Sequence, residues 1–219
     1  MYEERPGSKA LPLPPLLRSV SKSYGAALNL FGPISRGVGW RKPEEQVMRF
    51  HILAQVMAGR RHRGGVSINE LGCGYGAMFD AFRTEPFMQD GSYWGYDINQ
   101  RMLAQAEARI SDPRARFIHG HEVTRMADYS LVSGTYNIKM EADDATWLTF
   151  IEQSLTMLWK NSRLGLAFNM MSRLGEKKEK NLYYADPVYF VEFCQQTLSH
   201  NVCLRHDYHM PEWTILVTR

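Results

Sequence analysis

A glycine-rich segment at residues 70–76 carries the clearest chemical signal in this sequence of 219 residues. It reads Glu-Leu-Gly-Cys-Gly-Tyr-Gly, and it lies between an apolar run at residues 66–71 and a run of helix formers. Glycines permit positive φ angles and let a ligand approach the backbone closely. A strand, a tight turn and a helix in this order place a ligand at the carboxyl end of a sheet strand. The segment therefore predicts a cofactor site formed by Glu70, Gly72, Cys73, Gly74 and Gly76.

A second acid, Asp97, follows the next β-like run, at residues 93–98. A carboxylate can accept hydrogen bonds from two neighbouring hydroxyl groups, which suits the vicinal diol of a ribose. Asp97 is also placed to cap the helix that follows, and the two roles are compatible. The spacing thus adds a ribose site to the glycine-rich turn.

These residues resemble the first motif of the class I S-adenosylmethionine-dependent methyltransferases, which is an acid, one residue and then three alternating glycines. The resemblance implies that Glu70 binds the ammonium group of the cofactor and that Asp97 binds its ribose. It also implies that Ile98 and Met102 flank the adenine. After the third strand this family often has Gly-Asp, whereas this chain has His121 and Glu122. Those two residues either take over the adenine contact or are simple loop residues.

The glycines alone leave an alternative open, because Gly72, Gly74 and Ala77 also satisfy the dinucleotide-binding fingerprint. An NAD(P)-dependent oxidoreductase is therefore the competing enzyme class. The acid two positions before the first glycine is typical of the methyltransferases. So are the helical region before the turn and the terminal pair of β-like runs at residues 202–207 and 213–218. A non-catalytic interaction protein on the same scaffold, or a merely structural turn, remains a further alternative.

The remaining chain alternates between short apolar runs and amphipathic segments, which indicates a mostly parallel sheet with helices on both faces. We predict an α/β fold, a Rossmann-like doubly wound sheet of seven strands, with an antiparallel last strand and an N-terminal helical cap. Prolines make residues 1–20 an irregular arm, and a helix is expected from Pro43 to Gly59. Residues 1–62 form the arm and cap, and residues 63–219 form one compact cofactor-binding domain. Further strands are expected at 115–118, 129–133 and 164–170, and further helices at 77–82, 101–110, 145–159 and 186–198.

Several segments together are similar to a group of bacterial methyltransferases of poorly defined substrate. They are residues 39–40, 46–50, 133–137, 168–169, 182–187 and 212–216. The resemblance implies that four residues roof the cofactor pocket: Tyr24, Trp40, Gln46 and Arg49. Packing within the cap is the alternative for Trp40, and it is favoured for Phe50.

Methyl transfer from a sulfonium is an in-line displacement, so proximity and alignment are the main contributions of the protein. The end of the fourth strand, at Ser133 and Gly134, should line the methionine portion of the cofactor and open onto the acceptor. A base must also take the proton of the acceptor. We select His121, Tyr136, Tyr184 and His209 as candidates, although a lone histidine is more often structural. His119, His206 and Glu212 are weaker candidates of the same kind.

Some acceptor classes lack their motif in this sequence. Residues 133–136 read Ser-Gly-Thr-Tyr where exocyclic-amine methyltransferases have Asn/Asp-Pro-Pro-aromatic. No Pro-Cys pair offers the nucleophile used on cytosine, and no acid cluster predicts a metal. We therefore expect a small-molecule acceptor, such as a sugar, an amine or a biosynthetic intermediate, with residues 177–184 as a candidate lid. An RNA or protein methyltransferase is the less favoured alternative.

Composition sets the remaining expectations. The formal net charge of +3 does not imply a nucleic-acid partner, and residues 60–63 are interpreted as a basic linker. The three cysteines form no CxxC pair, which fits a reducing compartment without disulfides. Acidic residues near the N-terminus argue against a secretory signal, and no stretch of about 20 apolar residues predicts a membrane span. A cytoplasmic enzyme is expected, and a homodimer is left open.

Overall fold

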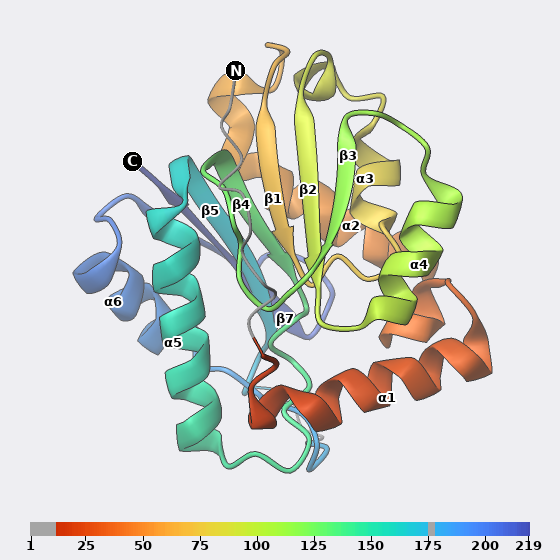
Figure 1. The fold of residues 1–219 in the computed structure, drawn as a ribbon. Coiled ribbons are helices and arrows are strands. Elements are labelled where there is room, and N and C mark those ends of the chain that lie inside the picture. Colours follow the sequence, from red (N-terminus) through yellow and green to blue (C-terminus); the bar gives the residue numbers. More distant parts are fainter. Residues whose placement is uncertain (1–11, 175–177) are drawn as a thin grey trace.

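The architecture is a seven-stranded sheet in the order β3-β2-β1-β4-β5-β7-β6 (Figure 1). The computed structural model describes residues 12–174 and 178–219, so the predictions for the first part of the arm and for Lys177 lie outside it. Neighbouring strands are parallel except for β7, which is antiparallel to both β5 and β6. This confirms the predicted fold class. The strands are β1 Ser67–Leu71, β2 Ser92–Asp97, β3 Ala115–His119, β4 Ala127–Ser133, β5 Ser162–Met171, β6 Val202–Arg205 and β7 Glu212–Thr218.

Helices cover both faces of the sheet, and one more helix lies across its carboxyl edge (Figure 1). α5 and α6 pack on one face, α2, α3 and α4 pack on the other, and α1 crosses the ends of the strands. The helices are α1 Pro15–Phe31, α2 Pro43–Leu53, α3 Ala77–Phe82, α4 Gln100–Arg109, α5 Asp144–Lys160 and α6 Pro187–Thr197. Short 3₁₀ segments are η1 Ser35–Val38, η2 Ala54–Arg60 and η3 Pro86–Met88. None of the helices in the described part of the chain is long and apolar enough to cross a membrane.

The predicted irregular arm is wrong from Pro15 onward, because α1 begins there. Proline at the first helical position loses nothing, since the N–H that it lacks would have no partner within the helix. Leu17, Val20 and Leu28 share one buried face of this helix, so its apolar spacing outweighs the preceding prolines. The next helix is also shorter than expected: α2 ends at Leu53, and the chain continues to Arg60 as the 3₁₀ segment η2.

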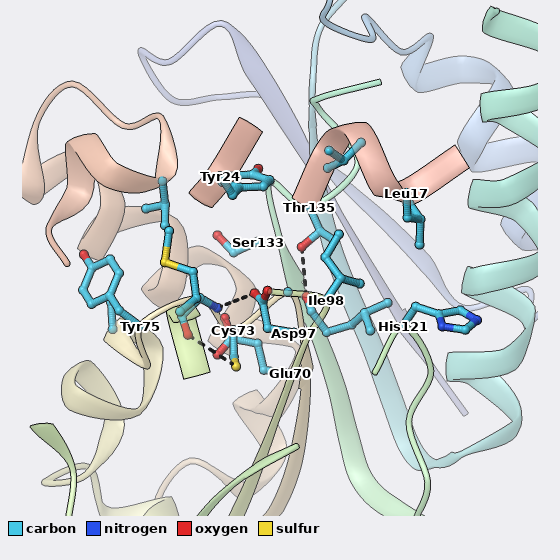
Figure 2. A pocket seen from close by; sticks show the side chains of 18 of the residues that line it. Leu17, Tyr24, Glu70, Cys73, Tyr75, Asp97, Ile98, His121, Ser133 and Thr135 are labelled. Carbon is cyan, nitrogen blue, oxygen red and sulfur yellow. Dashed lines mark hydrogen bonds between the residues drawn. The ribbon is translucent and has the colours of Figure 1, made fainter. Parts of the chain in front are cut away.

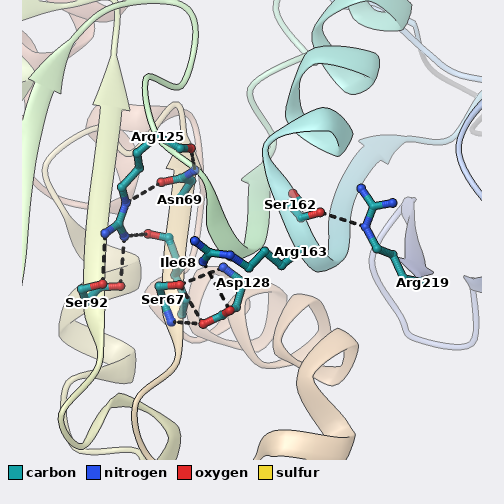
Figure 3. A network of polar contacts seen from close by, with 9 residues as sticks. All are labelled: Ser67, Ile68, Asn69, Ser92, Arg125, Asp128, Ser162, Arg163 and Arg219. Atoms are coloured by element: carbon teal, nitrogen blue, oxygen red, sulfur yellow. Dashed lines mark hydrogen bonds and ion pairs between the residues drawn. The ribbon is translucent and has the colours of Figure 1, made fainter. Parts of the chain in front are cut away.

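The connection from β3 to β4 is unusual because it contains no helix. Parallel strands normally need a crossover of about a dozen residues, most often helical. Here residues 120–126 cross β2 and β1 as irregular chain, and the Arg125 side chain fastens them to the sheet (Figure 3). Its guanidinium donates to Asn69 Oδ1 at 3.1 Å, to Ser92 Oγ at 3.0 Å and to the Ile68 carbonyl at 3.0 Å. Gly120 and His121 begin this link directly after β3 and so lie at the carboxyl edge of the sheet.

Candidate functional site

A cavity lies at the carboxyl ends of the strands, beneath α1 (Figure 2). Thirteen of the residues predicted to bind or roof the cofactor line it: Tyr24, Trp40, Gln46, Glu70, Gly72, Cys73, Gly74, Asp97, Ile98, Met102, His121, Ser133 and Gly134. The fold therefore gathers in one place residues that the sequence spreads from Tyr24 to Gly134.

Three residues predicted to bind the cofactor do not line this cavity. Gly76 adopts φ +82° at the start of α3, and a Cβ added there would lie 2.6 Å from Ile110 Cδ1, so its lack of a side chain serves packing. The Glu122 side chain is half exposed. Arg49 is buried behind Trp40, whose ring centroid lies 3.8 Å from the guanidinium carbon.

The glycine-rich turn packs too tightly for side chains. Gly72 has φ +79°, and a Cβ on it would lie 2.1 Å from Thr135 Oγ1. The Thr135 hydroxyl donates in turn to the Leu71 carbonyl at 2.9 Å. The Gly72 amide donates to the Tyr96 carbonyl at 2.7 Å, which fixes the turn against the end of β2. The backbone of the turn is thereby held open toward the cavity.

Asp97 connects the turn to the start of α4. Its carboxylate accepts from the amide of Gly74 and from the amide of Asn99, each at 2.8 Å. Asn99, not Asp97, is the N-cap of α4, because its side chain accepts from Arg101 and Met102. Burial raises the pKa of Asp97, and the two amide hydrogen bonds oppose that effect. A carboxylate has about four lone-pair sites, so two remain for the hydroxyl groups of a ligand.

Glu70 is a second buried carboxylate in the same cavity. It is 2% exposed, and the Tyr93 hydroxyl donates to its Oε2. Burial raises the pKa of Glu70 to about 8, and the nearby charge of Asp97 contributes to the rise. A positively charged ligand beside Glu70 would favour its ionised form. The ammonium and sulfonium groups of S-adenosylmethionine fit these acids.

The Ser133 hydroxyl offers an independent test of that fit. It is buried and has no hydrogen-bond partner among the described residues. Figure 2 shows it within the cavity, near Tyr24 and Thr135. A buried hydroxyl without a partner is unfavourable, and a polar ligand atom in the cavity would supply one. The residues present therefore suit a ligand with both charged and polar groups.

The roof of the cavity comes from α1. Leu17, Val20 and Tyr24 line the cavity from this helix. The Ser21 hydroxyl donates to the Ile98 carbonyl at 3.3 Å, and Asn99 Nδ2 donates back to the Ser21 carbonyl at 2.8 Å. Burial raises the pKa of Tyr24, so its hydroxyl stays protonated. α1 is thus bonded directly to the loop that carries Asp97.

Several residues of the cavity wall are not predicted from the sequence. Leu17 and Val20 fall in the predicted irregular arm, although their spacing with Tyr24 follows one face of a helix. Thr135, Trp147 and Phe150 also line the cavity, beyond the end of β4. The two aromatic residues carry no signal in the sequence that separates them from ordinary core residues of α5.

The four candidates for the base are not brought together. His121 lines the cavity. Tyr136 is fully buried in the core, where its hydroxyl is bonded to Ser154 Oγ at 2.8 Å. The Tyr184 hydroxyl accepts from the Glu179 amide at 3.0 Å, outside the cavity lining, and the His209 side chain is 61% exposed. Within the described ranges, no group of three His, Cys, Asp or Glu side chains is placed to hold a metal ion.

The segment predicted as a lid is attached to the loop after β4. The amides of Lys139 and Met140 both donate to the Asn181 carbonyl at 3.0 Å, and the Tyr183 amide donates to the Asn137 carbonyl at 2.8 Å. Lys177 lies outside the described residues. The lid stays a prediction.

No family model matches this chain. A curated protein of Mycobacterium tuberculosis (strain ATCC 25618 / H37Rv), named "Putative methyltransferase Rv1506c", is 39% identical over 156 residues. The alignment covers 70% of this chain and 93% of that protein. The similarity therefore extends over nearly the whole relative.

Solved structures share the fold at low sequence identity. Magnesium protoporphyrin IX methyltransferase from Synechocystis PCC 6803, with bound S-adenosylhomocysteine, aligns with a TM-score of 0.62 at 10% identity and covers 92% of this chain and 95% of that one. A SAM-dependent methyltransferase from Aquifex aeolicus has a TM-score of 0.58 at 10% identity, with coverages of 89% and 97%. The [4+2]-cyclase SpnF has a TM-score of 0.62 at 14% identity, with coverages of 90% and 76%.

Proposed function

Since this chain belongs to the class I S-adenosylmethionine-dependent methyltransferases, we propose that it methylates an oxygen or nitrogen of a small-molecule acceptor. The cofactor is S-adenosylmethionine, and the NAD(P)-dependent alternative is set aside because the curated relative and several structural neighbours of this chain are named methyltransferases. A sugar, an amine or a biosynthetic intermediate is the acceptor class that we propose.

The cover that α1 forms over the cavity is the observation that carries the proposal of a small acceptor. Leu17, Val20 and Tyr24 place α1 across the cavity, and this helix is bonded to the loop of Asp97. A polymer would have to displace this helix in order to bring a side chain or base to the methyl donor, whereas a small molecule can be enclosed beneath it. This cover also limits the access of water, which strengthens the electrostatic interactions inside the site.

Within this cavity we assign the ammonium group of the cofactor to Glu70 and its ribose hydroxyls to Asp97. Ile98 and Met102 line the cavity next to Asp97 and provide apolar surface for the adenine. When bound, S-adenosylmethionine supplies a methyl group that is already activated by its sulfonium charge. The protein then contributes mainly orientation and exclusion of water. His121 is the candidate base that lies in the cavity, and it would take the proton of the acceptor.

Calorimetry and a turnover assay together test this function. The protein should bind S-adenosylhomocysteine and S-adenosylmethionine but not NADH, and it should form S-adenosylhomocysteine when a panel of small hydroxyl and amine compounds is supplied. Because SpnF is named a [4+2]-cyclase on a similar fold, binding without methyl transfer is a meaningful outcome. Binding without turnover across the whole panel would contradict the proposed reaction, and no binding of either sulfur compound would contradict the assigned site.

A further inference from the structure

Arg49, on α2, is a buried cation that lies immediately behind the cavity wall. It is 4% exposed, and its Nε donates to Glu212 Oε2 at 2.9 Å. Glu212 is 2% exposed and stands at the start of β7, paired with Met171 at the end of β5. The ion pair therefore lies at the carboxyl edge of the sheet, beside the strand ends that border the cavity.

Two routes connect this ion pair to the cavity. On one side, Glu212 Oε1 accepts from Asn169 Nδ2 at 3.2 Å, and Asn169 Oδ1 accepts from the Gly134 amide at 2.7 Å. On the other side, the Trp40 ring packs on the Arg49 guanidinium, with 3.8 Å between the ring centroid and the guanidinium carbon. Gly134 and Trp40 both line the cavity, and a Cβ on Gly134 would lie 2.4 Å from the indole. The contacts form a closed ring from Gly134 to Asn169, Glu212, Arg49, Trp40 and back.

One nitrogen of the Arg49 guanidinium is left without a partner in this ring of contacts. Arg49 Nη1 is buried and has no hydrogen-bond partner among the described residues. A guanidinium has five N–H donors and no acceptor, so only an atom with a free lone pair can satisfy it. Leaving a buried charged donor unpaired is unfavourable, and a purely structural ion pair gains nothing from it. A ligand atom with a free lone pair is therefore suited to accept a hydrogen bond from Nη1.

We propose that Arg49 determines acceptor specificity by donating from Nη1 to an anionic oxygen of the acceptor, with Trp40 moving aside to admit it. The inference rests on the proposed function and narrows its acceptor class. A carboxylate oxygen would supply both the lone pair that Nη1 lacks and a charge opposite to that of the guanidinium. An ammonium group would instead place a donor and a positive charge against the guanidinium. Acceptors with an anionic oxygen should therefore be preferred over amines.

Matched probes test this preference without any substitution. Protein saturated with S-adenosylhomocysteine is titrated with benzoate, benzyl alcohol and benzylammonium, and binding is followed by calorimetry. Benzoate should bind at least about tenfold more tightly than benzylammonium, as expected for a hydrogen bond to a charged group. Equal affinities, or no binding of benzoate at its solubility limit, would overturn the inference. Failure of S-adenosylhomocysteine itself to bind would contradict the proposed function instead.

A pair of variants separates recognition from a structural role. Arg49→Lys keeps a positive charge facing Glu212 but loses the second donor, so benzoate affinity should fall about tenfold while S-adenosylhomocysteine affinity changes by less than about twofold. Glu212→Gln disturbs the same ion pair but keeps Nη1, so it should retain the preference for benzoate over benzylammonium. An ion pair that is only structural predicts the same effect from both variants, and that result would overturn the inference.

Discussion

The amide of Gly74 donates a hydrogen bond of 2.8 Å to Asp97 Oδ2, which joins the glycine-rich turn to the end of the neighbouring strand. The second oxygen of the same carboxylate accepts from the Asn99 amide at 2.8 Å. One side chain thus fixes the backbone on which the amino-acid part of the cofactor should rest, and it faces the position proposed for the ribose. The two halves of the proposed cofactor site cannot move independently.

Substitution of Asp97 tests this coupling. Asp97→Asn removes the charge that the ribose hydroxyls and the Gly74 amide would share, so affinity for S-adenosylhomocysteine should fall roughly 10- to 100-fold in calorimetry. Asp112→Asn is the matched control, because Asp112 pairs with Arg114 and does not line the cavity. Equal affinity in Asp97→Asn and the unmodified protein would refute the ribose assignment.

A substitution at Gly72 tests how tightly the glycine-rich turn is packed. Gly72→Ala forces a side chain into φ +79° and toward Thr135 Oγ1, so the free energy of unfolding should fall by about 2–4 kcal/mol in urea denaturation. Gly59→Ala is the control, since nothing lies within 4 Å of a Cβ at that position. A Gly72→Ala protein as stable as the Gly59→Ala protein would show that the turn is not packed as described.

A substitution at Ser133 tests whether its unpaired hydroxyl binds the cofactor. Because this hydroxyl has no partner in the protein, Ser133→Ala should leave stability within about 0.5 kcal/mol but weaken S-adenosylmethionine binding about 3- to 10-fold. Ser154→Ala provides the opposite pattern, because its hydroxyl is bonded to Tyr136: it should lose about 1 kcal/mol of stability and keep its affinity. A loss of stability without a loss of affinity in Ser133→Ala would contradict a ligand-binding role.

The buried carboxyl group of Glu70 should make the free energy of unfolding depend on pH. Burial raises its folded-state pKa from 4.5 to about 8, so the folded protein holds this proton more tightly than the unfolded chain. Its contribution is fully present below pH 4.5 and is lost as the pH rises through about 8. Glu70→Gln should therefore gain stability relative to the unmodified protein across this window, as measured by urea denaturation at a series of pH values. Parallel curves for the two proteins would contradict the buried, protonated state.

Much of this fold can be predicted from the sequence, because the apolar spacing, the positions of the glycines and the alternation of strands and helices all indicate the same sheet. The strand predicted at residues 66–71 and the helix predicted at 77–82 match β1 and α3 to within one residue. The glycines between them adopt positive φ angles, which end the strand and separate it from the helix. The terminal pair β6 and β7 is antiparallel as predicted, because its link is short. Only the first turns of α1 differ from the prediction, because the prolines before them favoured an irregular arm over the buried face of Leu17 and Val20.

The site was predictable only in part, for a physical reason. Gly72 and Asp97 lie at the ends of adjacent strands, so their distance in sequence from each strand is enough to predict where they lie. Tyr136 was selected for its chemistry, but whether its ring points into the cavity or the core depends on packing against α5, which the local sequence does not encode. Arg49 was expected at the cofactor, and its pairing with Glu212, 163 residues away, depends on the position of β7 in the sheet.

A crystal structure of the protein with S-adenosylhomocysteine would locate the cofactor directly. We expect the ribose hydroxyls on Asp97, the ammonium group beside Glu70, the adenine against Ile98 and Met102, and the sulfur near Ser133. Density for the ligand at another site, or a ligand in this cavity without contact to Asp97 and Glu70, would contradict this assignment.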